Sequence, residues 1–175
     1  MAQKVNVTSK QFFLSMVVIN IVLAFSQVML SFVVFFIHSQ NENPVPVVII
    51  SNTIAISAGM LLMTFGILMS RLVFTKRLEK LKQEPTLQQK MRKFNSTVII
   101  GYALMEFPGL ICIAFSFITC NTILLIFPIV VAVALIYYRP TKRFVQENLN
   151  LSLDDLKIID DPNAVLYQAY RNNRD

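Results

Sequence analysis

Long runs of apolar residues, separated by short polar segments, dominate the hydropathy pattern of the chain. A helix needs about 20 predominantly apolar residues to cross the hydrocarbon core of a bilayer. The runs do not alternate between apolar and polar positions with a period of two, which argues against the strands of a membrane barrel. The pattern therefore predicts four transmembrane helices, over residues 12–37, 45–74, 97–119 and 122–138.

The composition favours the same all-α membrane class. Of the 175 residues, 55% are apolar and 15% are charged, whereas a soluble domain carries about 25% charged residues. Two Cys and one His exclude a disulfide framework and leave too few soft ligands for a Cys/His zinc site. The sequence therefore predicts an integral bundle of four transmembrane helices, and we expect neither a metal nor a cofactor.

The positions of the 16 Lys and Arg residues predict one orientation in the bilayer. They fall before the first predicted span, between Arg71 and Lys93, or from Arg139 onward. Because cytoplasmic segments hold the excess of Lys and Arg, we expect both termini and the 75–96 loop on the cytoplasmic side of the inner membrane. The net charge of +6 is then explained by attraction of this face to anionic lipid, and no nucleic acid is needed.

The sequence divides into a transmembrane domain, residues 1–143, and a cytoplasmic tail, residues 144–175. Within the transmembrane domain, the 75–96 loop carries apolar residues at helical spacing on both sides of Pro85. This pattern predicts a helical hairpin that extends the second and third spans. The hairpin is also basic, but its interspersed acids favour a structural role over lipid recognition.

The tail is predicted to be short and helical. Ser152 and Asp155 have the spacing of a capping box, and Asp161 followed by Pro162 is typical of a helix start. After Pro162, apolar residues recur at the helical positions 165, 166, 169 and 170. This apolar stripe must pack either on the 75–96 loop or on a partner.

Glu106 is the one acidic or basic residue well inside a predicted span. A charge at the bilayer midplane costs roughly 2.5–3.5 kcal/mol on insertion scales, so we expect Glu106 to be neutral for much of the time. Pro108 lacks an N–H and frees a carbonyl one turn earlier, while Gly101 and Gly109 allow a neighbouring helix to approach closely. Together these residues predict a site for a proton or a sodium ion.

A structural interpretation of Glu106 stays open beside the ionic one. A protonated Glu106 can hydrogen-bond a polar side chain of another span and so hold the helices together. The polar residues available for this are Asn20, Gln27, Ser51, Asn52, Thr53, Ser57 and Thr64. His38, at the outer end of the first span, is expected to be interfacial and functionally silent.

The residues around Glu106 resemble the second half of the ring subunit c of rotary ATP synthases. That subunit is a helical hairpin with a polar Arg-Gln-Pro loop on the cytoplasmic side, and its second helix typically reads Gly-x-Ala-Leu-x-Glu. Here residues 98–106 read VIIGYALME and residues 82–85 read KQEP. The resemblance covers residues 51–119. It implies that Glu106 is the carrying carboxylate, and that Gln83 and Pro85 belong to the loop that faces the rotor stalk.

Two functions follow from these observations. The first is proton or sodium handling at Glu106 within an oligomer or a complex. The alternative is a non-catalytic membrane scaffold or accessory subunit, which docks a partner through its helices and its C-terminal tail. An enzyme is not expected, because the sequence has no Ser/His/Asp set, no HExxH motif and no phosphate-binding glycine loop.

Overall fold

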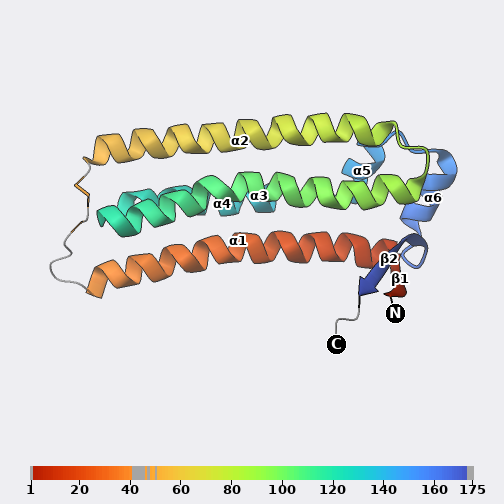
Figure 1. Ribbon diagram of the computed structural model, residues 1–175, viewed down its shortest axis with the longest axis horizontal. Coiled ribbons are helices and arrows are strands. Elements are labelled where there is room, and N and C mark those ends of the chain that lie inside the picture. Colours follow the sequence, from red (N-terminus) through yellow and green to blue (C-terminus); the bar gives the residue numbers. More distant parts are fainter. Residues whose placement is uncertain (1, 41–45, 47, 50, 173–175) are drawn as a thin grey trace. The chain divides into compact units, whose positions relative to one another are not determined.

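The computed structural model describes residues 2–40, 46, 48, 49 and 51–172. Helices make up most of this part of the chain, and one pair of short strands joins its two ends (Figure 1). The elements are β1 (Ala2–Thr8), α1 (Ser9–Gln40), α2 (Asn52–Lys82), α3 (Leu87–Thr119), the 3-10 turn η1 (Thr122–Leu125), α4 (Ile126–Tyr137), α5 (Lys142–Asn148), α6 (Leu153–Asp160) and β2 (Val165–Asn172).

Hydroxyl side chains start most of these helices. A side-chain oxygen that accepts a hydrogen bond from a backbone N–H of the first turn satisfies a group that the helix itself leaves unpaired. At α1 the pairing is reciprocal, because Thr8 and Gln11 each accept from the other's backbone N–H and so form a capping box. The hydroxyl caps are Thr8 for α1, Ser51 for α2, Thr86 for α3, Thr141 for α5 and Ser152 for α6.

Three helices, α1, α2 and α3, are long and apolar enough to cross a membrane. The fourth predicted span is less regular. Helices η1 and α4 reach the length and hydropathy of a membrane span only when α5 is included, and the chain bends by 72° before α5. Residues 122–137 of η1 and α4 rise about 26 Å, slightly less than the hydrocarbon thickness of about 30 Å. The structure thus confirms the helical class and gives three helices that could span a membrane.

The second predicted span begins later than expected. Helix α2 starts at Asn52, and residues 46, 48, 49 and 51 are not helical. Pro46 lacks an N–H and is therefore unfavourable inside a helix, and Ser51 caps α2. Val45 and residues 47 and 50 lie outside the described residues, as do positions 41–44, which precede this span. Helix α1 continues past the first predicted span to Gln40.

The chain separates into two compact units, each built from segments that are distant in the sequence. Unit 1 comprises residues 1–19, 74–99 and 139–175. Unit 2 comprises residues 20–73 and 100–138. Helices α1, α2 and α3 contribute residues to both units.

Unit 1 brings the N-terminal segment, the α2–α3 connection and the tail together around a shared apolar core. Its fully buried side chains include Phe12, Met91, Phe94, Leu149, Ile159 and Leu166. The ring of Phe12 meets that of Tyr167, and the ring of Phe144 meets those of Phe74 and Phe94. The helical hairpin around Pro85 is confirmed, because α2 ends at Lys82 and α3 begins at Leu87.

The tail prediction is correct at α6 and wrong after it. Ser152 and Asp155 form the expected capping box. Residues 165–172, however, form strand β2, which pairs antiparallel with β1. Asp161 accepts the backbone N–H groups of Asn163 and Ala164 and closes a turn. The carbonyls of Pro162 and Ala164 then accept from the first N–H groups of α1, so the segment caps another helix and does not begin one.

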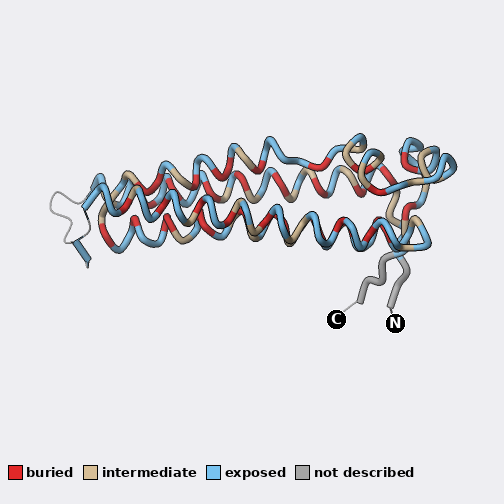
Figure 2. The backbone as a smooth tube through the Cα atoms, turned by 90° about the horizontal axis from the view of Figure 1, so that it is seen from above, coloured by how far each residue is buried: buried red, intermediate tan, exposed pale blue. Residues whose placement is uncertain are grey.

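Unit 2 has the burial pattern of a protein surrounded by lipid. Along its helices, buried positions recur on one side while the others are exposed (Figure 2). Large apolar side chains such as Phe25, Phe32, Leu61 and Phe65 are more than half exposed, whereas a soluble protein rarely exposes so wide an apolar surface. Several polar side chains, among them Asn20, Gln27 and Ser31, are by contrast buried inside the unit.

Candidate functional site

Small residues let the helices of unit 2 approach closely. A Cβ atom added to Gly66 of α2 would lie 2.2 Å from Cγ of Pro108 on α3. A Cβ added to Gly59 would lie 2.2 Å from the ring of Phe127 on α4. The hydroxyl of Ser70 donates to the carbonyl of Gly101 at 2.8 Å. These contacts fix the depth of α3, and therefore of Glu106, against α2.

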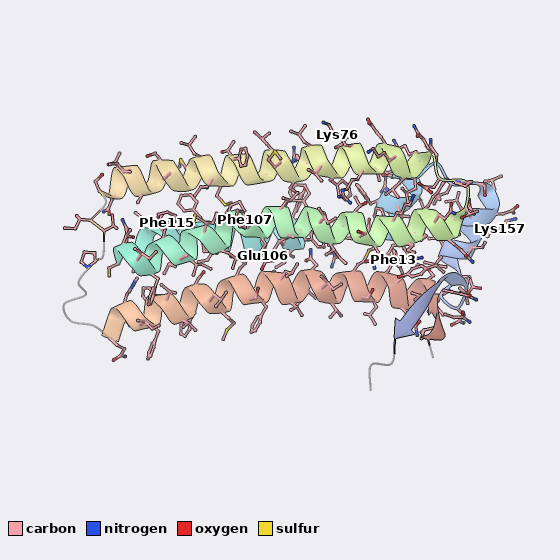
Figure 3. The ribbon with its side chains drawn as sticks, viewed as in Figure 1. Phe13, Lys76, Glu106, Phe107, Phe115 and Lys157 are labelled. Atoms are coloured by element: carbon pink, nitrogen blue, oxygen red, sulfur yellow. The ribbon has the colours of Figure 1, made fainter. Side chains whose placement is uncertain are left out.

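Glu106 lies on the side of α3 that faces α1 (Figure 3). Its side chain is partly buried, and Oε1 lies 3.3 Å from the hydroxyl of Ser26. None of the ion pairs among the described residues involves Glu106. The one cationic side chain of unit 2, Arg71, donates to the hydroxyl of Tyr138 and lies over its ring. The carboxyl therefore has a neutral partner.

The pair formed by Ser26 and Glu106 suits both protonation states of the carboxyl. The hydroxyl of Ser26 also lies 2.8 Å from the carbonyl of Leu23 on its own helix. A hydroxyl has one proton, so it donates to one of these two acceptors at a time. When it donates to Leu23, a protonated Glu106 can donate to the serine oxygen; when Glu106 is ionised, the hydroxyl can turn toward the carboxylate. A rotation of one bond thus follows the loss or gain of a proton.

Gln27 holds the backbone of the site. Its side chain is 0% exposed, and Nε2 donates to the main-chain carbonyl of Glu106 at 3.2 Å. Gly109 makes room for this amide, since an added Cβ would lie 2.6 Å from Oε1 of Gln27. Oε1 itself has no hydrogen-bond partner among the described residues. A buried amide oxygen without a partner is rare and costly, and such atoms mark places where water or an ion binds.

The structure brings only some of the sequence-predicted residues together. Gln27 and Gly109 meet beside the main chain of Glu106, whereas Pro108 packs against Gly66 of α2 and Gly101 lies one to two turns away on α3. Asn20 instead donates to the carbonyl of Leu135, in the last turn of α4, at 2.7 Å. The remaining polar candidates lie elsewhere. The side chain of Asn52 accepts a hydrogen bond from that of Asn121, the hydroxyls of Ser57 and Thr64 donate to carbonyls of their own helix, and Thr53 is exposed. Gln83 and Pro85 belong to unit 1.

Ser26 is the residue that sequence reasoning missed. Serine is common in membrane helices, and no sequence pattern distinguishes the one that meets a carboxyl on another helix. The contact depends on the register between α1 and α3, which run parallel in unit 2, and a single sequence does not contain that register. The one available signal is that Ser26 and Gln27 are adjacent polar residues within a largely apolar run.

Other concave or ligand-rich features of unit 2 carry no comparable chemistry. An apolar cavity of about 80 Å³ lies between α2, α3 and η1, with Gly59, Cys112 and Phe115 among its lining residues, and none of its surface is polar. Cys112 and Cys120 are free thiols. Within the described part of the chain, no three His, Cys, Asp or Glu side chains are grouped as metal ligands.

Comparison with known proteins adds no family to this description. No protein-family model, no curated protein and no solved structure matches the chain.

Proposed function

We propose that this is a multi-pass protein of the cytoplasmic membrane with four spans, the fourth formed by η1 and α4. The exposed apolar surface of unit 2 supports a bilayer around it. Tyr137 is the last residue of α4 and Tyr138 follows it, and aromatic residues are enriched at membrane interfaces. Of the 16 Lys and Arg residues, only Arg71 belongs to unit 2. This supports a cytoplasmic location for both termini and the α2–α3 connection, with anionic lipid at the basic face.

We further propose that Glu106 takes up and releases a proton or a sodium ion. The observation that carries this proposal is the pairing of the carboxyl with a single hydroxyl, at 3.3 Å, with no cationic partner among the described residues. A carboxyl kept only for packing is best held by a fixed donor, whereas Ser26 can serve either protonation state. The resemblance of residues 98–106 to the ion-carrying helix of subunit c supports the same role.

Carbodiimide labelling tests this proposal, because the reagent modifies protonated carboxyls in apolar surroundings. We expect the wild-type protein in detergent to be labelled at Glu106, and the Glu106→Gln variant to lose that label. Glu84→Gln is the matched control, since Glu84 pairs with Lys93 in unit 1 and is expected to be unlabelled. Added sodium that slows the labelling identifies a sodium site, and labelling governed by pH alone identifies a proton site.

The proposal is refuted if Glu106 does not react at any pH at which the protein is folded. It is also refuted if Glu84 and Glu106 are labelled to the same extent, because Glu106 would then be no more protonated in its apolar surroundings than a carboxyl of unit 1. Mass spectrometry of the digested protein assigns the label to one residue.

A second candidate function is that of a membrane scaffold or accessory subunit without catalytic activity. The observation in its favour is a ridge of exposed aromatic residues on α1, formed by Phe25, Phe32 and Phe36. The tail contributes less to such docking than its sequence suggests, because Ile159 and Leu166 are fully buried within unit 1. The mass of the protein in detergent separates the cases: a multiple of the 20.0 kDa chain indicates self-association, and a co-purifying subunit indicates a complex.

A further inference from the structure

A line of polar residues runs along one face of α1 through unit 2. Asn20, Gln27, Ser31 and His38 follow one another at spacings of seven, four and seven residues. At about 100° per residue these positions fall within roughly 40° of one line on the helix. His38 is 18 residues after Asn20, a rise of about 27 Å, which is close to the hydrocarbon thickness of about 30 Å. The polar line is therefore almost as long as a bilayer is thick.

This line faces the interior of unit 2. The side chains of Asn20, Gln27 and Ser31 are at most 4% exposed, whereas the neighbouring Ile21, Val28 and Phe32 are exposed. Asn20 contacts α4 through Leu135, Gln27 contacts α3 through Glu106, and His38 stacks on Phe117 of α3. Helix α3 contributes a matching set at seven-residue spacing: Tyr102, Gly109 and Ser116.

Several polar atoms of this interior have no hydrogen-bond partner among the described residues. They are Oε1 of Gln27, the hydroxyls of Tyr102 and Ser116, and both ring nitrogens of His38. Gln27 and Ser116 are 0% exposed. A buried polar group is normally paired with protein or with bound water, and within a bilayer it has no bulk water to turn to. Such atoms lie at successive depths, and internal water is the partner that buried polar groups without a protein partner usually take.

We infer that this polar line is a water-filled proton path that serves Glu106, which makes the proton the ion carried. The inference rests on the proposed function of Glu106. Protons move along it by transfer between neighbouring water molecules, so each step breaks one O–H bond and forms another. The protonated carboxyl gives its proton to the nearest water and regains one from the other direction. His38 can accept a proton on one ring nitrogen and release one from the other.

An apolar layer interrupts the path between Ser31 and His38. Val34 follows Ser31 by one turn on the same face of α1, and it packs with Ile113 of α3 and Leu125 of η1 in one buried cluster. A ring of apolar side chains blocks a narrow aqueous path by expelling water. The geometry therefore places Glu106 in continuity with the half of the path toward Asn20, and it makes the Val34 layer the gate toward His38.

Proton flux into liposomes tests the path. The full-length protein is reconstituted in phosphatidylcholine liposomes that contain a pH-sensitive dye, and a potassium diffusion potential with valinomycin drives proton entry. We expect Val34→Ala, which thins the gate, to raise the initial rate several-fold. Val33→Ala is the matched control, because Val33 is the adjacent, exposed residue and its truncation should leave the rate unchanged.

A second pair of variants tests the polar groups themselves. In the Val34→Ala background, Gln27→Leu keeps the size of the side chain and removes its polar atoms, and we expect it to lower the rate about tenfold. Gln88→Leu, the same replacement at an exposed position of unit 1, should have no effect. The path is refuted if Gln27→Leu and Gln88→Leu behave alike, or if Val34→Ala and Val33→Ala do.

Infrared spectroscopy of the wild-type protein keeps the test independent of how the variants fold. The carboxyl band assigned by difference to Glu106→Gln should shift within seconds of transfer to D2O, and a band that does not exchange refutes the path. Carbodiimide labelling separates the two proposals. Normal labelling of Glu106 with no effect of the path variants removes the path and leaves the ion site, whereas loss of labelling removes both.

Discussion

Lys90 is a buried cation with an unusual pair of partners, and its replacement by Met gives a sharp prediction. Its side chain is 8% exposed, and Nζ donates to the carbonyls of Leu149 at 3.3 Å and Asn150 at 3.0 Å. These carbonyls follow the end of α5, where Asn150 has a positive φ of 46° and the helix cannot pair them. Lys90 of α3 therefore fastens the tail to unit 1.

The magnitude follows from two opposing effects of Lys90→Met. Each hydrogen bond from a charged donor contributes about 1.5–3 kcal/mol, and both are lost. Removal of a buried ammonium returns several kcal/mol of desolvation cost, since none of the ion pairs among the described residues includes Lys90. Met fills the space of the alkyl stem, so no cavity is added. We expect the docking of α5 and α6 to weaken by about 1–3 kcal/mol, which is roughly a 5- to 150-fold change in the opening equilibrium.

Hydrogen exchange measured by mass spectrometry on the protein in detergent checks this prediction. Peptides that cover residues 142–160 should lose protection by that factor in Lys90→Met. Lys93→Met is the matched control one turn later on α3: Lys93 is 58% exposed and pairs with Glu84, and a surface ion pair contributes at most about 1 kcal/mol. Equal loss of protection in the two variants, or protection unchanged in Lys90→Met, would refute the role assigned to the buried ammonium.

Two further predictions concern helix contact in unit 2 and the pH dependence of unit 1. Gly66→Ala should destabilise the protein by about 1–3 kcal/mol, because its Cβ would meet the ring of Pro108 at 2.2 Å. In a thermal melt, adding Pro108→Ala to Gly66→Ala should restore part of the lost stability. Purely additive effects of the two substitutions would contradict the contact. Burial raises the pKa of the Tyr167 hydroxyl above its usual 10.0, more than Asn95 and Arg92 lower it. The folded state therefore prefers the neutral phenol, so its stabilising effect is present below pH 10 and is lost as the pH rises further. The melting temperature of wild type should fall in this alkaline range more steeply than that of Tyr167→Phe, and parallel curves would exclude Tyr167 as the cause.

The long helices were predictable because their cause is local. Continuous apolar runs set α1, α2 and α3, and the residues around Pro85 set the break between α2 and α3. The capping box at Ser152 was predictable for the same reason, since its two members are three residues apart. The capping box at Thr8 has the same form, and its Thr-x-x-Gln spacing was available in the sequence.

The strand at Val165–Asn172 was missed because its cause is not local. Its apolar residues fit helical spacing as well as they fit a strand. Whether this segment forms a helix or a strand depends on β1, which pairs with it from the other end of the chain. It also depends on α1, because the first N–H groups of α1 donate to the carbonyls that a helix starting at Pro162 would use. Neither partner is visible from the tail alone.

The candidate site was half predictable. Glu106 stands out from composition, because it is the one acid deep in an apolar run, and Gln27 was among its proposed partners. Ser26 and the polar line through His38 depend on which faces of α1 and α3 meet. The seven-residue spacing from Asn20 to Gln27 pointed to such a face, and His38 at the same phase belongs to it.

The pairing of β1 with β2 sets the order in which unit 1 is completed during synthesis. Residue 165 follows residue 8 by 157 positions, which at about 5–20 residues per second is roughly 8–30 s of translation. The first strand must therefore wait unpaired until residues 165–172 have been made. Unit 1 closes only after these residues have left the ribosome, and a chain cut short before Val165 leaves β1 without its neighbour and the start of α1 without the carbonyls that accept its first N–H groups.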